Sequence, residues 1–225
     1  MNRWWIETLD RFALLGGLGG TLLVKIIVYF IVTRFRDCNL PPGSVVLDHP
    51  LPDSPSRPPG TRWSQAGITT ILVVDYGFAI FTVIASITGS WVFVPPFLFL
   101  HLPVWLNWVG VVSVWILDLW VVSLLYYNVN YTAAFQGIKG KYVLATGGPY
   151  KWVRHPSYMV ACLGTIAIFL VTELWPALLC ILLWGAVRAQ AIGEEGMMRK
   201  IFGETYEKYY NTTGRFLPKL TRKTP

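Results

Sequence analysis

Long apolar stretches alternate with polar loops along the chain, and this pattern predicts helices that cross a membrane. The five candidate segments are 12–32, 66–88, 104–125, 158–172 and 174–192. The first three have roughly the 20 residues that a helix needs to span a hydrocarbon core of about 30 Å. The fourth is shorter and is followed by the turn sequence Glu-Leu-Trp-Pro, so we expect the last two segments to form a helical hairpin.

The segments between and after these helices complete the predicted architecture. Residues 40–59 hold seven of the 15 prolines, which excludes a helix there and indicates a mobile cytosolic loop. Beyond residue 192 the chain becomes polar, and we expect a cytosolic helical tail. The prediction is therefore an all-α integral membrane protein with about five transmembrane helices, folded as a single membrane domain over residues 1–225.

The composition supports a membrane protein and excludes several other classes. Hydrophobic residues make up 54% of the chain and charged residues 14%, whereas an ordinary soluble domain has about a quarter charged residues. This balance excludes a disordered chain, a nucleic-acid-binding tail and a secreted disulfide scaffold. The 11 tryptophans suit a protein with two membrane–water interfaces, where Trp and Tyr side chains anchor.

The distribution of positive charge predicts the orientation in the membrane. Lysine and arginine gather in residues 33–65, in residues 126–157 and beyond residue 192, whereas residues 89–103 have none. Because cytosolic loops are enriched in these residues, we expect a cytosolic C-terminus and an N-terminus outside or in the lumen, in the endoplasmic reticulum if the source is eukaryotic. The net charge of +7 suits the anionic lipids of a membrane surface, and its spread over three regions does not favour a nucleic-acid partner.

Residues that could take part in ligand binding or catalysis are concentrated between 136 and 218. The sequence Thr-Gly-Gly-Pro at 146–149 predicts a turn that leaves backbone N–H groups free to meet a ligand. On the last helix, Gln190 and Glu194 are four residues apart and share a face, while Arg188 points roughly the opposite way. We expect these polar groups at the cytosolic lip of a membrane-embedded cavity. No cysteine or histidine stands near another at metal-site spacing, so we expect no metal.

Each of these residues alone also has a purely structural interpretation. Arg154 can extend its guanidinium to lipid headgroups, and Glu194 and Glu195 can form a solvated helix end. A lone His155 is more often an interfacial histidine with satisfied hydrogen bonds than a catalytic one. The ordered set of motifs around them is harder to explain in this way.

Short motifs follow one another in order along this region. They are Gly-Pro-Tyr at 148–150, Arg-His-Pro-Ser-Tyr at 154–158, an apolar hairpin, Glu-Glu at 194–195 and Phe-Gly-x-x-Tyr at 202–206. In this order they resemble isoprenylcysteine carboxyl methyltransferases and their membrane methyltransferase relatives. The resemblance implies an enzyme that uses S-adenosylmethionine, with a cofactor pocket open to the cytosol and a lipid-side tunnel for a prenyl chain. It implies methyl transfer to the C-terminal carboxylate of a prenylated cysteine, in a protein or a small molecule.

Carried over residue by residue, the resemblance gives a cofactor-binding set. Its members are Gln136, Tyr142, Val143, Leu144, Ala145, Tyr150, His155, Pro156, Ser157, Tyr158 and Glu194, with Gln136 matched only after a one-residue gap. The family arginine that meets the substrate carboxylate falls at Gln190, so Gln190 and the nearby Arg188 are the substrate-binding candidates. Val160 replaces the usual family glycine. No catalytic residue is assigned, because methyl transfer to an already ionised carboxylate needs orientation and exclusion of water.

Other activities stay open at this point. The same fold can methylate another lipophilic acceptor, such as a phospholipid amine or an isoprenoid metabolite. The neutral amide of Gln190 can hydrogen-bond a carboxylate, more weakly than arginine, and it equally suits an acceptor without a carboxylate. Membrane sterol reductases, which bind NADPH, end in a similar tail, but their chains are usually much longer. A non-catalytic membrane scaffold is the remaining alternative.

Overall fold

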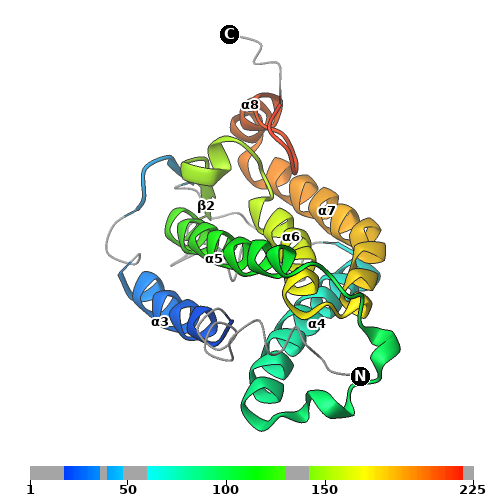
Figure 1. Ribbon diagram of the computed structural model, residues 1–225. Helices are drawn as coiled ribbons and strands as arrows, with labels where there is room; N and C mark the ends of the chain where they lie inside the picture. Colours follow the sequence, from blue (N-terminus) through cyan, green and yellow to red (C-terminus); the bar gives the residue numbers. More distant parts are fainter. Residues whose placement is uncertain (1–17, 36–39, 48–59, 130–141, 220–225) are drawn as a thin grey trace. The chain divides into compact units, whose positions relative to one another are not determined.

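The structure, a computed structural model, describes residues 18–35, 40–47, 60–129 and 142–219, and most of these are helical (Figure 1). The helices are α3 (Gly20–Phe35), α4 (Arg62–Thr88), α5 (Val104–Tyr127), α6 (Pro156–Thr172), α7 (Trp184–Phe202) and α8 (Glu204–Thr212). The 3-10 segments are η2 (Ser90–Phe93), η3 (Pro96–Leu98), η4 (Gly148–Lys151) and η5 (Trp175–Leu183). Two strands, β1 (Ser44–Leu47) and β2 (Tyr142–Ala145), complete the described elements.

Within the described residues, three helical segments are long and apolar enough to cross a membrane: Arg62–Thr88, Val104–Tyr127 and the continuous segment Trp175–Phe202. Helix α6 is apolar but has only 17 residues. These helices indicate an integral membrane protein. The total of five spans stays a prediction, because segment 12–32 lies partly outside the described residues and α6 is short. The transmembrane hairpin formed by the last two segments therefore also stays a prediction.

The last two apolar segments are joined by a short turn. Helix α6 ends at Thr172, and Glu173 adopts a left-handed backbone conformation with φ of 60°. The chain continues as η5, with Pro176 in the first turn, where its missing N–H removes no helical hydrogen bond. Helix α7 then extends to Phe202, beyond the predicted end at residue 192, because its apolar face continues through the buried Ile201 and Phe202.

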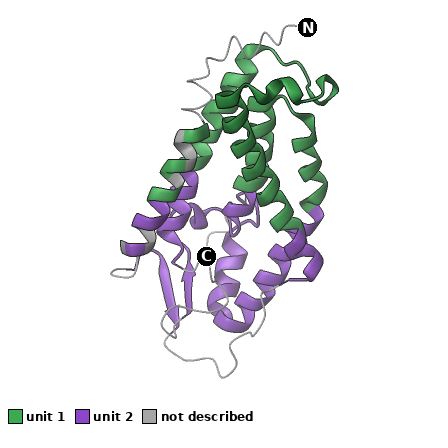
Figure 2. Cartoon of the chain, turned by 90° about the horizontal axis from the view of Figure 1, so that it is seen from below, with its two compact units in different colours: residues 1–27, 67–119, 160–184 green, residues 28–66, 120–159, 185–225 purple. Residues whose placement is uncertain are grey.

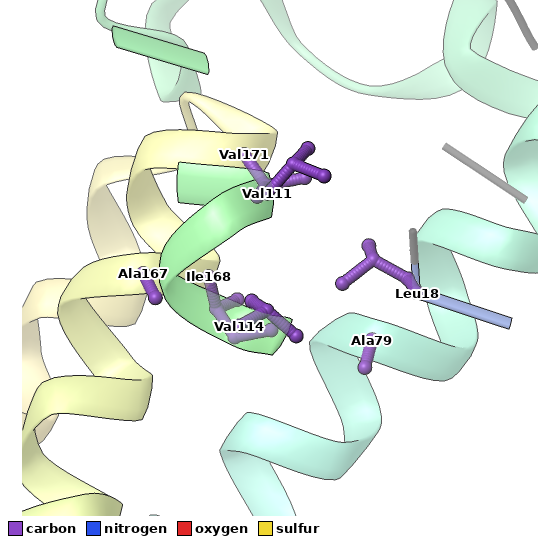
Figure 3. Close-up of a cluster of buried hydrophobic side chains, with 7 residues drawn as sticks. All are labelled: Leu18, Ala79, Val111, Val114, Ala167, Ile168 and Val171. Atoms are coloured by element: carbon purple, nitrogen blue, oxygen red, sulfur yellow. The ribbon is translucent and has the colours of Figure 1, made fainter. Parts of the chain in front are cut away.

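The chain divides into two compact units, drawn in green and purple in Figure 2. The first comprises residues 1–27, 67–119 and 160–184, and the second comprises residues 28–66, 120–159 and 185–225. The core of the first unit is a cluster of buried side chains, shown in Figure 3: Leu18, Ala79, Val111, Val114, Ala167, Ile168 and Val171. Helices α5 and α6 come close there because Gly110 has no Cβ, which would lie 2.8 Å from the backbone nitrogen of Val171.

The second unit contains a strand pair that the all-α prediction missed. Strands β1 and β2 are antiparallel, with Ser44 opposite Ala145 at one end. Strand β1 lies inside the Pro-rich segment 40–59, so the prediction of a loop is wrong for this part, while residues 48–59 lie outside the described residues. The local sequence Ser-Val-Val-Leu has the β-branched residues that favour strands, and Val45 packs against a buried cluster.

This strand pair packs against the C-terminal helices of the same unit. The buried cluster joins β2 to α7 and α8 through Tyr142, Leu144, Met197, Ile201, Phe202 and Tyr206. After β2, the N–H and the hydroxyl of Thr146 both donate to the carbonyl of Gly43, so this N–H is not free for a ligand as predicted. A Cβ at Gly147 would collide with the carbonyl of Pro42, so glycine permits this close approach.

Candidate functional site

Gln190 and Glu194 share a face of α7, as their spacing predicted, and lie in a hydrogen-bond network of the second unit. Glu194 accepts hydrogen bonds from the hydroxyl of Tyr158 and from Nε2 of Gln190, the latter at 3.2 Å. Nδ1 of His155 lies 3.3 Å from the other carboxylate oxygen. The side chain of Glu194 is 23% exposed, so it is the less buried of the two glutamates at this point of α7.

His155 lies immediately before α6, whose first residue is Pro156, a favourable position for proline. The His155 ring stacks on Tyr158 with 5.4 Å between centroids, and its Nε2 lies 3.5 Å from Oε1 of Glu195. Each ring nitrogen therefore faces a carboxylate, which suits the protonated ring with its two donors. Burial by itself lowers the pKa of His155, but the two neighbouring carboxylates of Glu194 and Glu195 outweigh burial and hold the pKa above its ordinary value.

Folding stability is expected to depend on the protonation of His155. Because its pKa is raised in the folded state, the charged ring stabilises the fold below the unfolded pKa of about 6.5, and this contribution is lost as the pH rises through the raised pKa. The melting temperature of the wild type minus that of His155→Asn, measured in detergent, should therefore decrease with increasing pH. A difference that grows with pH would contradict this expectation.

Glu195 forms a buried ion cluster with two arginines. Nε of Arg154 lies 3.0 Å from one carboxylate oxygen, and Nη2 of Arg215 lies 2.6 Å from the other. The side chains of Glu195 and Arg154 are only 1% and 5% exposed. The interpretations of Arg154 as an arginine extended to headgroups and of Glu195 as part of a solvated helix end are therefore wrong, because these two side chains are buried and paired with each other.

The segment after α8 holds this ion cluster in place. The backbone N–H of Arg154 donates to the carbonyl of Gly214 at 2.8 Å, and the backbone N–H of His155 donates to the carbonyl of Arg215 at 3.0 Å. The ring of Phe216 lies 6.2 Å from the ring of His155. The tail residues thus fix both the backbone and the surroundings of His155.

The two substrate-binding candidates, Gln190 and Arg188, lie in different surroundings. Gln190 is buried, its Oε1 accepts a hydrogen bond from the hydroxyl of Ser64 at 2.9 Å, and its Nε2 faces Glu194. Arg188 is exposed on α7, and the helical register turns it away from Glu194 as predicted. Gln190 therefore joins the network, and Arg188 does not.

The other predicted cofactor-binding residues lie in the same unit. Strand β2 buries four of them, Tyr142, Val143, Leu144 and Ala145. Tyr150 is also buried; its hydroxyl accepts a hydrogen bond from Asn128, and its carbonyl accepts one from the hydroxyl of Tyr209. Ser157 is partly buried in the first turn of α6, beside Pro156. Gln136 lies outside the described residues.

Two contributors to the network had no assigned role in the sequence. Arg215 lies within the motif region 136–218, and this position in the sequence could have indicated a role in the site. Ser64 lies far upstream, and its only local signal is the spacing Thr61-x-x-Ser64, in which the Thr61 hydroxyl accepts the Ser64 N–H at 3.1 Å and caps α4. Among the residues that the structure describes, no three His, Cys, Asp or Glu side chains form a group that could hold a metal ion.

Comparison with known proteins gives an independent result. Residues 105–205 match the family model described as phospholipid methyltransferase, and no curated protein matches the chain significantly. The matched range contains the motifs at 148–150, 154–158 and 194–195. The phospholipid methyltransferase family belongs to the same superfamily as the isoprenylcysteine carboxyl methyltransferases. The apolar helices, the order of the motifs and the family match therefore agree, and residues 105–205 are similar to membrane methyltransferases of this superfamily.

Proposed function

We propose that this protein transfers a methyl group from S-adenosylmethionine to the amine of a phospholipid headgroup. The match to the phospholipid methyltransferase family supports a membrane lipid as acceptor. The observation that carries the proposal is the charge of the site. The side chain of Glu194 is partly exposed, and neutral Gln190 occupies the position of the arginine that meets the substrate carboxylate in isoprenylcysteine enzymes. A partly exposed acidic side chain beside a neutral residue at position 190 suits an amine better than a second carboxylate.

The residues of the network fit the cofactor that the family implies. S-adenosylmethionine carries an ammonium group, a sulfonium group and an aromatic base. The carboxylate of Glu194 suits the positive groups, and the ring of Tyr158 beside it suits a cation or a base. When bound, the cofactor would supply an electrophilic methyl group to the neutral form of the acceptor amine, which is present once the headgroup has lost its proton to solvent. The role of the chain is to bind and orient the two reactants and to exclude water.

The carboxylate of a prenylated cysteine is the second candidate acceptor, supported by the order of motifs from 148 to 206. This acceptor requires a positive group in the site. Among the described residues, Arg154 and Arg215 both pair with Glu195, the charged His155 ring lies between the carboxylates of Glu194 and Glu195, and Arg188 is exposed on another face of α7. The amine is therefore the better supported acceptor, and an isoprenoid metabolite without a carboxylate fits the same argument less specifically.

Transfer of a labelled methyl group separates these candidates. Purified protein in nanodiscs receives methyl-labelled S-adenosylmethionine and, in separate reactions, phosphatidylethanolamine, farnesylcysteine or an isoprenoid lipid extract. We expect label in the phospholipid amine. Label in farnesylcysteine or in the isoprenoid fraction instead would reassign the acceptor. Binding of NADPH without binding of S-adenosylmethionine would favour the reductase alternative and overturn the proposal.

We further propose that the network faces the cytosol, with the C-terminus cytosolic and the N-terminus outside, in the endoplasmic reticulum of a eukaryotic source. The distribution of lysine and arginine supports this orientation. In a background without other cysteines, Lys208→Cys should react with a membrane-impermeant reagent from the cytosolic side, and Ser90→Cys from the opposite side. The reverse labelling pattern would overturn the orientation.

A further inference from the structure

The start of α4 reaches the network from outside the matched range 105–205. Ser64 lies in the first turn of α4 and is completely buried, although α4 is an apolar helix. Its hydroxyl oxygen lies 2.9 Å from Oε1 of Gln190, in α7. Ser64, which lies outside the matched range, therefore contacts Gln190, a predicted substrate-binding residue, and Gln190 in turn contacts the predicted cofactor-binding residue Glu194.

Gly60 allows this close approach. Its φ of 90° is a conformation that favours glycine, and a Cβ there would collide with Oε1 of Gln190 and lie 2.7 Å from the hydroxyl oxygen of Ser64. The backbone conformation thus favours glycine, and a larger residue would displace the side chains of Gln190 and Ser64 from their present positions. The turn from residue 60 to residue 64 is closely fitted to the amide of Gln190.

The orientation of the Gln190 amide follows from its contacts with Glu194 and Ser64. An ionised Glu194 only accepts hydrogen bonds, so the amide must direct Nε2 toward it and Oε1 away from it. The buried Oε1 then requires a donor, which the hydroxyl of Ser64 supplies. Without that donor, the amide loses the contact that determines which end faces Glu194.

We propose that Ser64 and Gln190 are positioning residues that hold the carboxylate of Glu194 in its ligand-binding orientation. The proposal rests on the proposed function, in which Glu194 binds the cofactor. Gln190 and Tyr158 both donate to Oε1 of Glu194, and Nδ1 of His155 lies near Oε2, so the carboxylate is held from both oxygens. Gln190 therefore acts on Glu194, although it occupies the place of a substrate-binding arginine.

Capping of α4 is the structural alternative for Ser64. Its hydroxyl oxygen also lies 2.9 Å from the carbonyl oxygen of Thr61 and accepts the N–H of Thr61 at 2.9 Å. If capping were the whole role, replacing Ser64 would lower thermal stability and leave the affinity for S-adenosylmethionine unchanged. Ligand affinity, measured on folded protein, therefore separates the two roles.

A double-mutant cycle on cofactor affinity tests the proposal. Isothermal titration with S-adenosylmethionine is carried out on the full chain in detergent, for the wild type, Ser64→Ala, Gln190→Ala and the double variant. We expect Ser64→Ala to weaken affinity about three- to tenfold, as for the loss of one buried hydrogen bond. The same change should have no effect when Gln190 is already alanine, because Ser64 acts through it.

Ser86→Ala is the matched control. Ser86 is also buried in α4, and within the described part of the chain its hydroxyl has no hydrogen-bond partner, so its removal should leave affinity unchanged. Equal affinity of wild type and Ser64→Ala, or the same loss in the Gln190→Ala background, would overturn the inference. If Ser64→Ala does not fold, an unchanged affinity in Gln190→Ala overturns it, and a three- to tenfold loss supports it. A wild type that does not bind S-adenosylmethionine overturns the proposed function instead.

Discussion

Replacing Glu195 with glutamine is expected to lower the free energy of unfolding by about 3–5 kcal/mol. The side chain of Glu195 is 1% exposed and pairs with two arginines, of which Arg154 is itself 5% exposed. Glutamine has nearly the same shape but no charge, so the guanidinium of Arg154 would stay buried without its counter-charge. Thermal unfolding in detergent, followed by circular dichroism, measures the loss.

The control for this variant is Glu207→Gln. Glu207 also pairs with an arginine, at 2.6 Å from Arg199, but the two side chains are 47% and 39% exposed. An exposed pair of this kind contributes about 0–1 kcal/mol, because water and salt screen the charges. Equal losses in the two variants would show that burial of the Glu195 cluster does not determine its contribution.

Glu194→Ala and His155→Ala are each expected to weaken the binding of S-adenosylmethionine by about tenfold or more, while the protein stays folded in detergent. A hydrogen bond to a charged group contributes about 1.5–3 kcal/mol, which corresponds to roughly 10–150-fold in affinity. The side chain of Glu194 is partly exposed, and His155 lies against one of its carboxylate oxygens. Isothermal titration calorimetry measures both affinities.

Glu204→Ala serves as the control for these variants, because Glu204 is an exposed carboxylate in the first turn of α8. Its replacement should leave the affinity for S-adenosylmethionine unchanged. If Glu194→Ala and His155→Ala bind as tightly as the wild type, the network described here is not the cofactor site.

The sequence was sufficient to predict the long helices. Segments 66–88 and 104–125 correspond closely to α4 and α5, because long uninterrupted apolar stretches are a local property of the chain. The register within α7 was equally predictable: Gln190 and Glu194 contact each other because they are four residues apart. Arg188 lies on a different face for the same reason.

The strand pair was not predictable in the same way. Strand β1 is a short segment within a proline-rich region, and its partner β2 lies about a hundred residues later. Local sequence can favour an extended conformation at Val45 and Val46, but it does not specify the partner. The pairing depends on non-local packing, including that of β2 against α7 and α8.

The sequence by itself determined the apolar helices, the shared face of Gln190 and Glu194, and the order of the motifs that point to a methyltransferase. Only the tertiary structure decided the roles of Arg154 and Ser64. The sequence does not show whether a charged or polar residue is solvated or buried. The partner of Arg154 is Glu195 and that of Ser64 is Gln190, and both partners lie in α7, far away in the sequence. Burial makes the difference, because a charge or hydroxyl removed from water is stable only where another segment supplies its counter-charge or hydrogen bond.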